Sequence, residues 1–129
     1  DGGLGQGSGI PLQLALDSGC SRIFAILTRP KGFRKPAPDI GRSARMIANS
    51  YHKYPYVREA LLTRNERYNA ELEKLEQLAA EGKAYIVYAD KMAVENNTTD
   101  IKKLRSSYFD GYNQAQKEFP RWLEWLGIE

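Results

Sequence analysis

Two short apolar runs place the strongest constraint on how this chain can fold. Residues 22–28 are apolar over the length of a strand, and residues 84–88 are β-branched and aromatic. A long helical pattern separates the two runs, and such a crossover joins parallel strands. We therefore expect an α/β fold, mostly helical, with about two parallel strands. Because two strands make a poor sheet, we expect neighbouring strands to come from residues upstream of this chain.

Helix signals fill most of the remaining sequence. Pro11 opens a short apolar segment that Gly19 ends, and Gly82 ends a much longer one. Prolines and a glycine between residues 30 and 38 forbid regular structure there. We expect helices over residues 11–18, 42–53, 56–81 and 100–117, and a short final helix that opens at Pro120.

Apolar side chains at helical spacing predict which helix faces are buried. In the long helix these are Val57, Leu61, Tyr68, Leu72, Leu75 and Ala79. In the last long helix they are Ile101, Leu104, Tyr108, Tyr112 and Ala115. We expect Phe119, Trp122 and Leu126 to complete the core and Trp125 to be half exposed. Contact of these last four residues with a bilayer interface is the alternative.

Composition excludes several kinds of site. The chain has 129 residues, enough for one domain with a core, and it contains one cysteine and one histidine. Cys20 cannot form an internal disulfide and is expected to be a small buried hydrophobe. His52 is expected at a helix end, and a lone histidine makes a Cys–His pair or a histidine-rich metal site hard to build. We expect no cofactor and no metal.

The sequence contains no apolar run long enough to span a membrane and no visible signal peptide. We expect a cytoplasmic protein whose contact with a membrane, if any, is peripheral. The net charge is +3, but residues 29–58 contain eight Lys or Arg and one acid, so this segment carries +7.

The basic segment 29–45 has three interpretations. It begins at the carboxyl end of the first strand, where α/β proteins place their sites, so Arg29, Lys31, Arg34 and Lys35 could hold anionic headgroups. It could equally be a solvated basic loop. Nucleic acid is the third option, but the basic residues are not interleaved with exposed aromatics as in single-strand binders. We expect no nucleic-acid partner.

The chain opens on an aspartate within a glycine run that predicts a flexible loop over residues 1–10. This run matches neither the dinucleotide fingerprint nor the Walker loop. It contains no nucleophile elbow either, because Gln6 and Ile10 stand where Gly-x-Ser-x-Gly around Ser8 needs glycines. An aspartate before two glycines can sit on a tight turn close to a substrate. Asp1 is therefore the candidate catalytic residue, acting as a general base.

Several further motifs follow one another in order along the chain. They are Asp1-Gly2-Gly3, Ile10-Pro11-Leu12, Gly19-Cys20, the strand 23–27, Thr28-Arg29-Pro30-Lys31-Gly32-Phe33-Arg34, Tyr54-Pro55, residues 65–69, Glu81-Gly82-Lys83 and residues 108–115. Together they resemble the C-terminal part of bacterial patatin-like phospholipases, with Thr-Arg-Pro-Lys-Gly as the most specific block. The chain departs from that pattern in its loop, since family members often reach the Ile/Val-Pro pair sooner and without four alternating glycines.

The resemblance implies a Ser–Asp dyad that hydrolyses lipid acyl esters within a three-layer α/β/α fold. Asp1 aligns with the dyad aspartate, and Gly2 and Gly3 form the backbone turn beside it. The elbow serine and the oxyanion loop lie upstream, so the implied partners are a lipid or ester substrate and an upstream segment of the same protein. This chain alone is expected to be an inactive fragment.

The resemblance also implies a division of the chain. Residues 1–40 would end the catalytic domain, and residues 41–129 would form a helical C-terminal extension with one further strand. A second hypothesis belongs to a different class of function. In it, the chain is a non-catalytic α/β module that packs against its parent domain and binds anionic surfaces through residues 29–45.

Overall fold

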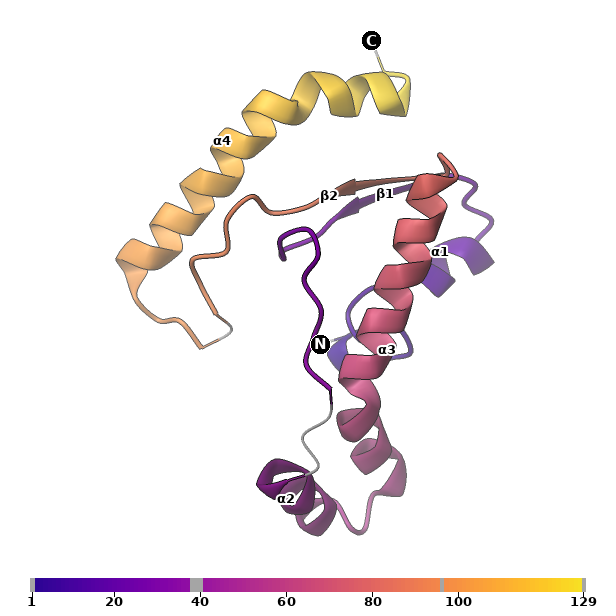
Figure 1. Ribbon diagram of the computed structural model, residues 1–129, viewed down its shortest axis with the longest axis vertical. Coiled ribbons are helices and arrows are strands. Elements are labelled where there is room, and N and C mark those ends of the chain that lie inside the picture. Colours follow the sequence, from indigo (N-terminus) through magenta and orange to yellow (C-terminus); the bar gives the residue numbers. More distant parts are fainter. Residues whose placement is uncertain (1, 38–40, 96, 129) are drawn as a thin grey trace. The chain divides into compact units, whose positions relative to one another are not determined.

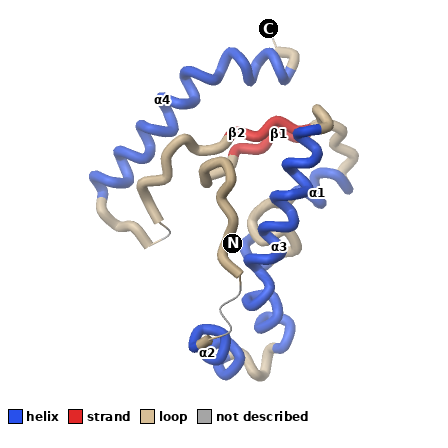
Figure 2. Tube along the Cα trace, viewed as in Figure 1, coloured by secondary structure: helices blue, strands red, loops and turns tan. Residues whose placement is uncertain are grey.

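The computed structural model describes residues 2–37, 41–95 and 97–128. In chain order its elements are η1 (Gly2–Leu4), α1 (Leu12–Asp17), β1 (Ile23–Ile26), α2 (Arg42–Ser50), α3 (Pro55–Ala80), β2 (Ala84–Val87) and α4 (Ile101–Leu126) (Figure 1). The mixture of many helical residues with one short sheet confirms the expected α/β class (Figure 2). The expected division at residue 40 concerns a longer protein and stays a prediction.

The chain groups into two compact units. The N-terminal unit comprises Asp1–Ile23 and Arg34–Ala84. The C-terminal unit comprises Phe24–Phe33 and Tyr85–Glu129. Each unit therefore combines segments that lie far apart in the sequence.

The two predicted strands pair in parallel, as expected. The amide of Ile23 donates to the carbonyl oxygen of Lys83 at 2.9 Å, and the amide of Leu27 donates to that of Val87 at 2.8 Å. Both partners advance by four residues between these bonds, which fixes the register. Figure 1 shows the two arrows side by side and pointing the same way.

The core of the N-terminal unit forms on one face of α3. Tyr68, Leu72 and Leu75 are buried there, as the apolar spacing predicts, and Leu75 is only 1% exposed. Ile10 and Leu12 from the N-terminal segment are also buried. The prediction is wrong for Val57, which is exposed because it lies in the first turn of α3, ahead of the buried stretch.

Both ends of α3 follow from local sequence chemistry. Pro55 occupies the first turn, where its missing N–H leaves no hydrogen bond unmade. Gly82 adopts φ +75° after the last turn, and the amide of Lys83 donates to the carbonyl oxygen of Leu78 at 2.9 Å. The predicted glycine stop is therefore confirmed.

Aromatic rings form the packed centre of the C-terminal unit. The rings of Phe24 and Tyr85 stack with centroids 5.4 Å apart, and Trp122 meets Phe24 edge-on at 5.8 Å. Trp125 is partly buried beside Phe24 at 6.0 Å, as expected. The expectation that Phe119 completes the core is wrong, because its side chain is largely exposed and contacts the edge of Trp122 from outside. Leu126, also expected in the core, is likewise exposed.

The final helix runs unbroken through Pro120, so the expected break there is wrong. One side-chain hydrogen bond crosses the proline: Nε1 of Trp122 donates to Oε2 of Glu118 at 3.3 Å. Glu118 is also tied to the turn before it, because its Oε1 accepts from Nε2 of Gln114 at 3.0 Å. Glu118 thus links the turns on either side, although proline removes one backbone bond. Figure 1 shows that α4 bends along its length instead of ending.

The other side of α4 is exposed. Ile101, Leu104, Tyr108 and Tyr112 were expected to face inward, and that prediction is wrong. Within the described residues of the C-terminal unit, no other element covers this face. Helical spacing identified an apolar face correctly, but spacing contains no information about what covers such a face.

The single cysteine and the single histidine of the chain are both exposed. Cys20 is exposed, contrary to the expected burial, because it lies in the bend between α1 and β1. His52 is exposed just after α2, as expected, with Nδ1 2.9 Å from the carbonyl oxygen of Asn49. None of the described helices has both the length and the apolar character to cross a membrane.

Replacing Leu75 with alanine tests the packing of α3. The substitution leaves a cavity at a side chain that is 1% exposed, so we expect the free energy of unfolding to fall by about 2–5 kcal/mol. The matched control is Leu14→Ala in α1, where the side chain is 69% exposed and the expected change is within about 0.5 kcal/mol. Urea unfolding followed by circular dichroism measures both. Similar losses in the two variants would contradict this placement of the core.

Candidate functional site

The glycine-rich segment forms a series of hydrogen-bonded turns, so the expectation of a flexible loop is wrong. The amide of Gly5 donates to the carbonyl oxygen of Gly2, that of Ser8 to Gly5, and that of Ile10 to Gly7, each at 3.0 Å. The first of these turns closes the short helix η1. Asp1, the predicted catalytic residue, lies outside the described residues. The backbone that follows it forms hydrogen-bonded turns from Gly2 onward. We call residues 2–10 the glycine loop.

Arg67 on α3 holds this loop from the side. Its Nη1 lies 3.4 Å from the carbonyl oxygen of Leu4 and 3.5 Å from that of Gln6, and it also donates to the carbonyl oxygen of Gly5. Carbonyl oxygens that converge in this way suit the fixed fork of a guanidinium. One side chain thus fixes three successive residues of the glycine loop.

The guanidinium of Arg67 is itself held from α3. Its Nη2 donates to the carbonyl oxygen of Ala60 at 2.8 Å, and its Nε donates to Oγ1 of Thr63 at 3.1 Å. These two bonds orient the plane of the guanidinium before it reaches the loop. Sequence analysis missed this residue, because Arg67 lies among charged residues on the polar side of the helical pattern and backbone acceptors have no sequence signature.

Steric fit explains why one glycine of the loop cannot carry a side chain. A Cβ atom on Gly7 would lie 1.9 Å from the carbonyl oxygen of Ile10, and it would also contact Cγ of Glu71 at 3.5 Å. The two following residues have left-handed backbones, with φ +50° at Ser8 and +109° at Gly9. Such a conformation is costly for serine, so the surrounding contacts must hold it.

Two buried polar groups lie in this part of the N-terminal unit. Ser8 is 3% exposed, and its hydroxyl has no hydrogen-bond partner among the described residues. Glu71 is also buried. Its Oε1 accepts from Nζ of Lys74 at 2.8 Å, while its Oε2 has no partner among the described residues. Sequence analysis did not predict this burial, although Glu71 lies three residues after Tyr68 and four before Leu75 and so shares their face.

The glycine loop also borders an open cavity of about 480 Å³. Gly2 and Gly3, the predicted turn residues, line it together with Gln13 and Leu14 from α1. The exposed side chain of Leu14 gives one wall an apolar surface. The space next to the predicted catalytic motif is therefore open and partly apolar.

Two of the four predicted headgroup-binding residues are occupied within the N-terminal unit. Arg34 forms a two-point ion pair with Glu76 of α3, with Nη1 3.3 Å from Oε1. Lys35 places its Nζ 4.0 Å from the centre of the Tyr68 ring. Asn69 holds the backbone of Lys35 through two hydrogen bonds, both 2.9 Å long. Both residues therefore have contacts with α3 that a ligand would have to share or replace.

The other two residues of that set belong to the C-terminal unit. The guanidinium of Arg29 lies 4.9 Å from the centre of the Phe33 ring, and Lys31 is exposed. Their role in headgroup binding stays a prediction.

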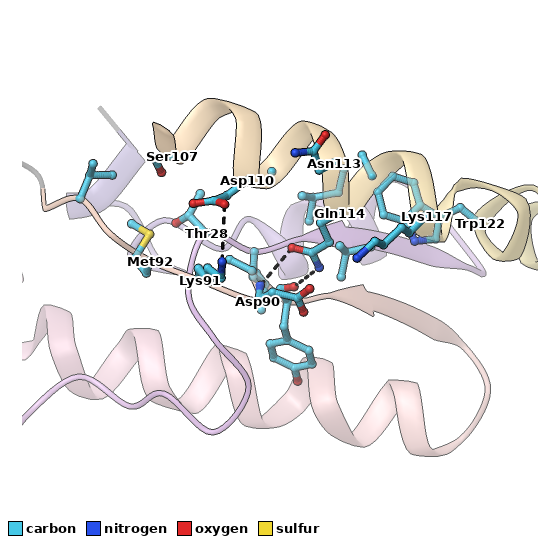
Figure 3. A pocket seen from close by; sticks show the side chains of 18 residues that line it. Thr28, Asp90, Lys91, Met92, Ser107, Asp110, Asn113, Gln114, Lys117 and Trp122 are labelled. Carbon is cyan, nitrogen blue, oxygen red and sulfur yellow. Dashed lines mark hydrogen bonds and ion pairs between the residues drawn. The ribbon is translucent and has the colours of Figure 1, made fainter. Parts of the chain in front are cut away.

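A second cavity, of about 610 Å³, lies in the C-terminal unit at the carboxyl ends of the two strands (Figure 3). Gln114 ties α4 to the segment after β2, since it donates to the carbonyl oxygen of Tyr88 at 2.7 Å and accepts from the amide of Asp90 at 3.0 Å. Lys91 and Asp110 form an ion pair of 3.7 Å across the cavity wall. These polar groups are thus used in holding the wall together.

No group of three His, Cys, Asp or Glu in the described ranges could hold a metal ion. Comparison with known proteins gives one match. The model of a family described as a domain of unknown function, DUF6363, matches residues 54–127, which is more than half of the chain. The chain belongs to the DUF6363 family. No curated protein and no solved structure matches the chain.

The DUF6363 match begins at Tyr54, so it covers α3, β2 and α4. The glycine loop and β1 lie outside it. Arg67, Glu71 and Gln114 lie within the DUF6363 region. Arg67 on α3 contacts the glycine loop, and Glu71 is the buried polar residue of the same helix. Gln114 on α4 contacts the segment after β2. The family thus provides the helices on which the N-terminal segment and the segment after β2 are held.

A pair of glycine substitutions tests the fit of the loop. Gly7→Ala forces a Cβ against the carbonyl oxygen of Ile10, so we expect the free energy of unfolding to fall by about 1–3 kcal/mol. Gly111→Ala is the matched control, because open space surrounds that position in the middle of α4 and alanine favours helix. It should raise the free energy of unfolding by about 1 kcal/mol. A stabilising Gly7→Ala in urea titrations would refute the loop geometry.

Removal of the guanidinium tests whether Arg67 holds the loop. In Arg67→Met we expect the amides of Ser8 and Ile10 to exchange with deuterium about tenfold faster, because the loop loses its contacts with α3. Arg64→Met, one turn earlier at an exposed position, is the control and should leave these rates unchanged. Hydrogen exchange followed by NMR measures both. Equal rates in the two variants would show that the loop holds itself.

Proposed function

We propose that this chain is the C-terminal part of a patatin-like serine lipid acyl hydrolase and that it supplies the aspartate of a Ser–Asp dyad. Asp1 is that aspartate. The nucleophilic serine and the oxyanion donors come from outside the chain, since no serine of this sequence stands in a Gly-x-Ser-x-Gly pattern. The substrate class is a lipid acyl ester.

The observation that supports this proposal most strongly is the fixed backbone directly after the Asp-Gly-Gly motif. A general base works only when its carboxylate is held within hydrogen-bond reach of the proton that it removes. Arg67 fixes the carbonyl groups of Leu4 and Gln6, and the turns of the glycine loop begin at Gly2. A plain linker would not need such anchoring.

The chemistry assigned to Asp1 is proton transfer. The carboxylate accepts the proton of the serine hydroxyl while the serine oxygen attacks the ester carbonyl, and it then returns that proton to the leaving alcohol. An acyl-enzyme remains, and water, deprotonated by the same carboxylate, releases the fatty acid. A dyad of this kind needs no histidine. Accordingly, the only histidine of the chain, His52, is exposed beyond α2 and can be left out of the mechanism.

The second hypothesis, a non-catalytic module that packs against another domain, has one observation in its favour. Ile101, Leu104, Tyr108 and Tyr112 form an exposed apolar row on α4. Exposed apolar surface of this kind is typical of sites that contact another protein surface. The two hypotheses agree on a partner segment and differ on whether Asp1 takes part in chemistry.

Substitution of Asp1 distinguishes them. In the full-length protein that contains this segment, Asp1→Asn should lower hydrolysis of a nitrophenyl ester by about 10²–10⁴-fold with an unchanged circular dichroism spectrum, because the base is lost. Asp17→Asn, at an exposed aspartate of α1, is the control and should retain full activity. The isolated 129 residues should give no turnover above buffer. Full activity of Asp1→Asn would remove Asp1 from the mechanism, and turnover by the isolated chain would refute the external serine.

A further inference from the structure

A surface of α2, the turn after it and the first turn of α3 combines exposed aromatic side chains with cations that form no ion pair with a described residue. We define the α2–α3 surface by six residues: Arg42, Arg45, Met46, Lys53, Tyr54 and Tyr56. All six are exposed and belong to the N-terminal unit. We propose that this surface binds the headgroup region of membranes that contain anionic phospholipids.

The charged side chains of this surface are all positive. Residues 42–58 contain four Lys or Arg and no acid. None of these four cations forms an ion pair with another described residue, because the ion pairs of the described chain involve Arg34, Lys74, Lys83 and Lys91. Unpaired cations on one surface attract a negatively charged bilayer, and each contributes about fivefold to binding.

The apolar residues of this surface are the kinds found at the boundary between headgroups and acyl chains. Tyr56 is 85% exposed, Met46 65% and Tyr54 62%. Tyrosine suits this boundary because its ring is apolar and its hydroxyl stays in water. Burial in the folded chain explains none of these three, although α2 has half-buried positions on its other side, at Ile47 and Ala48.

The contacts of α2 show why this surface stays open. Helix α2 packs on α3, and Figure 1 shows it folded back beside the first part of that helix. Its partly buried residues Ala44, Ile47 and Ala48 lie at the spacing of one helical face. Arg42, Arg45 and Met46 lie on the opposite, exposed face of α2. The helix therefore has one packed side and one basic, partly apolar side, which is the pattern of a helix that lies on a membrane.

A protein or nucleic-acid partner is the other class of occupant, and two observations favour the bilayer. The surface lacks the acidic residues that usually accompany basic ones at protein interfaces with paired charges. Tyr54 and Tyr56 stand together at the turn between α2 and α3 with Lys53 beside them, and no aromatic residue stands between Arg42 and Arg45 on α2. A single-strand binder places aromatics between its basic residues along one groove.

This inference deepens the proposed function, because it names the surface through which a lipid hydrolase would reach its substrate. Binding to vesicles needs neither Asp1 nor a serine. Asp1→Asn can therefore fail to lower hydrolysis while vesicle binding holds, and vesicle binding can fail while Asp1 proves catalytic.

Flotation with vesicles tests the proposal on the 129-residue chain. We expect binding to vesicles of phosphatidylcholine with 30% phosphatidylglycerol, and none to pure phosphatidylcholine. Arg42→Glu with Arg45→Glu should weaken binding about 25-fold or more, because two attractions become repulsions. Tyr54→Ser with Tyr56→Ser should weaken it about tenfold. Salt at 0.5 M should release the protein, since screening shortens the reach of charges to a few ångströms.

The matched control is Lys102→Glu with Lys103→Glu, which makes the same change of net charge at exposed residues of α4. It should leave vesicle binding within about twofold of the unmodified chain. Equal loss in the control would show that overall charge alone drives binding and would overturn the proposal. So would equal binding to pure phosphatidylcholine. Displacement from vesicles by a single-stranded oligonucleotide at equal charge concentration would overturn it in favour of nucleic acid.

Discussion

The burial of one face of α3 is the interaction on which the N-terminal unit depends. Tyr68, Leu72 and Leu75 lose their contact with water together, and this fixes the rotation of the helix about its own axis. Once that rotation is set, Arg67 reaches the glycine loop and Glu76 reaches Arg34. The polar contacts of the unit thus follow from the burial of the apolar face of α3. A loop with little packing surface of its own gains its shape from the helix beside it.

Burial of this face of α3 also has a cost, which falls on Glu71. It lies in register with the apolar stripe, so the packing that buries Leu72 and Leu75 also removes its carboxylate from water. Lys74 neutralises one oxygen, and the other has no partner among the described residues. Gly7 lies beside this side chain, since a Cβ atom built on Gly7 would be 3.5 Å from Cγ of Glu71. A buried carboxyl oxygen without a described partner next to a strained turn is a costly arrangement, and strained backbone clusters at functional sites.

Local signals in the sequence were enough for the strands and for most helix ends. Pro55 and Gly82 have conformational preferences that hold in any surroundings, so α3 could be bounded in advance. Pro120 did not mark a helix boundary, because α4 continues through it with Glu118 hydrogen-bonded to Gln114 on one side and to Trp122 on the other. Arg67 could not be predicted as an anchor, since its acceptors are backbone oxygens that every residue carries. The predicted burial of the apolar row on α4 was wrong for another reason. Helical periodicity identifies an apolar face but does not say which element packs against it.

The distribution of partners divides the basic segment in a way that composition could not. Charge counting assigns +7 to residues 29–58 as a whole and treats each cation alike. In the structure, Glu76 on α3 compensates the charge of Arg34, whereas Lys35 keeps its charge against the neutral ring of Tyr68. Arg42, Arg45 and Lys53 form no ion pair with a described residue, so α2 and the turn after it carry three uncompensated charges of the N-terminal unit. Since attraction to a charged surface depends on uncompensated charge, this part of the segment contributes to whatever the N-terminal unit attracts.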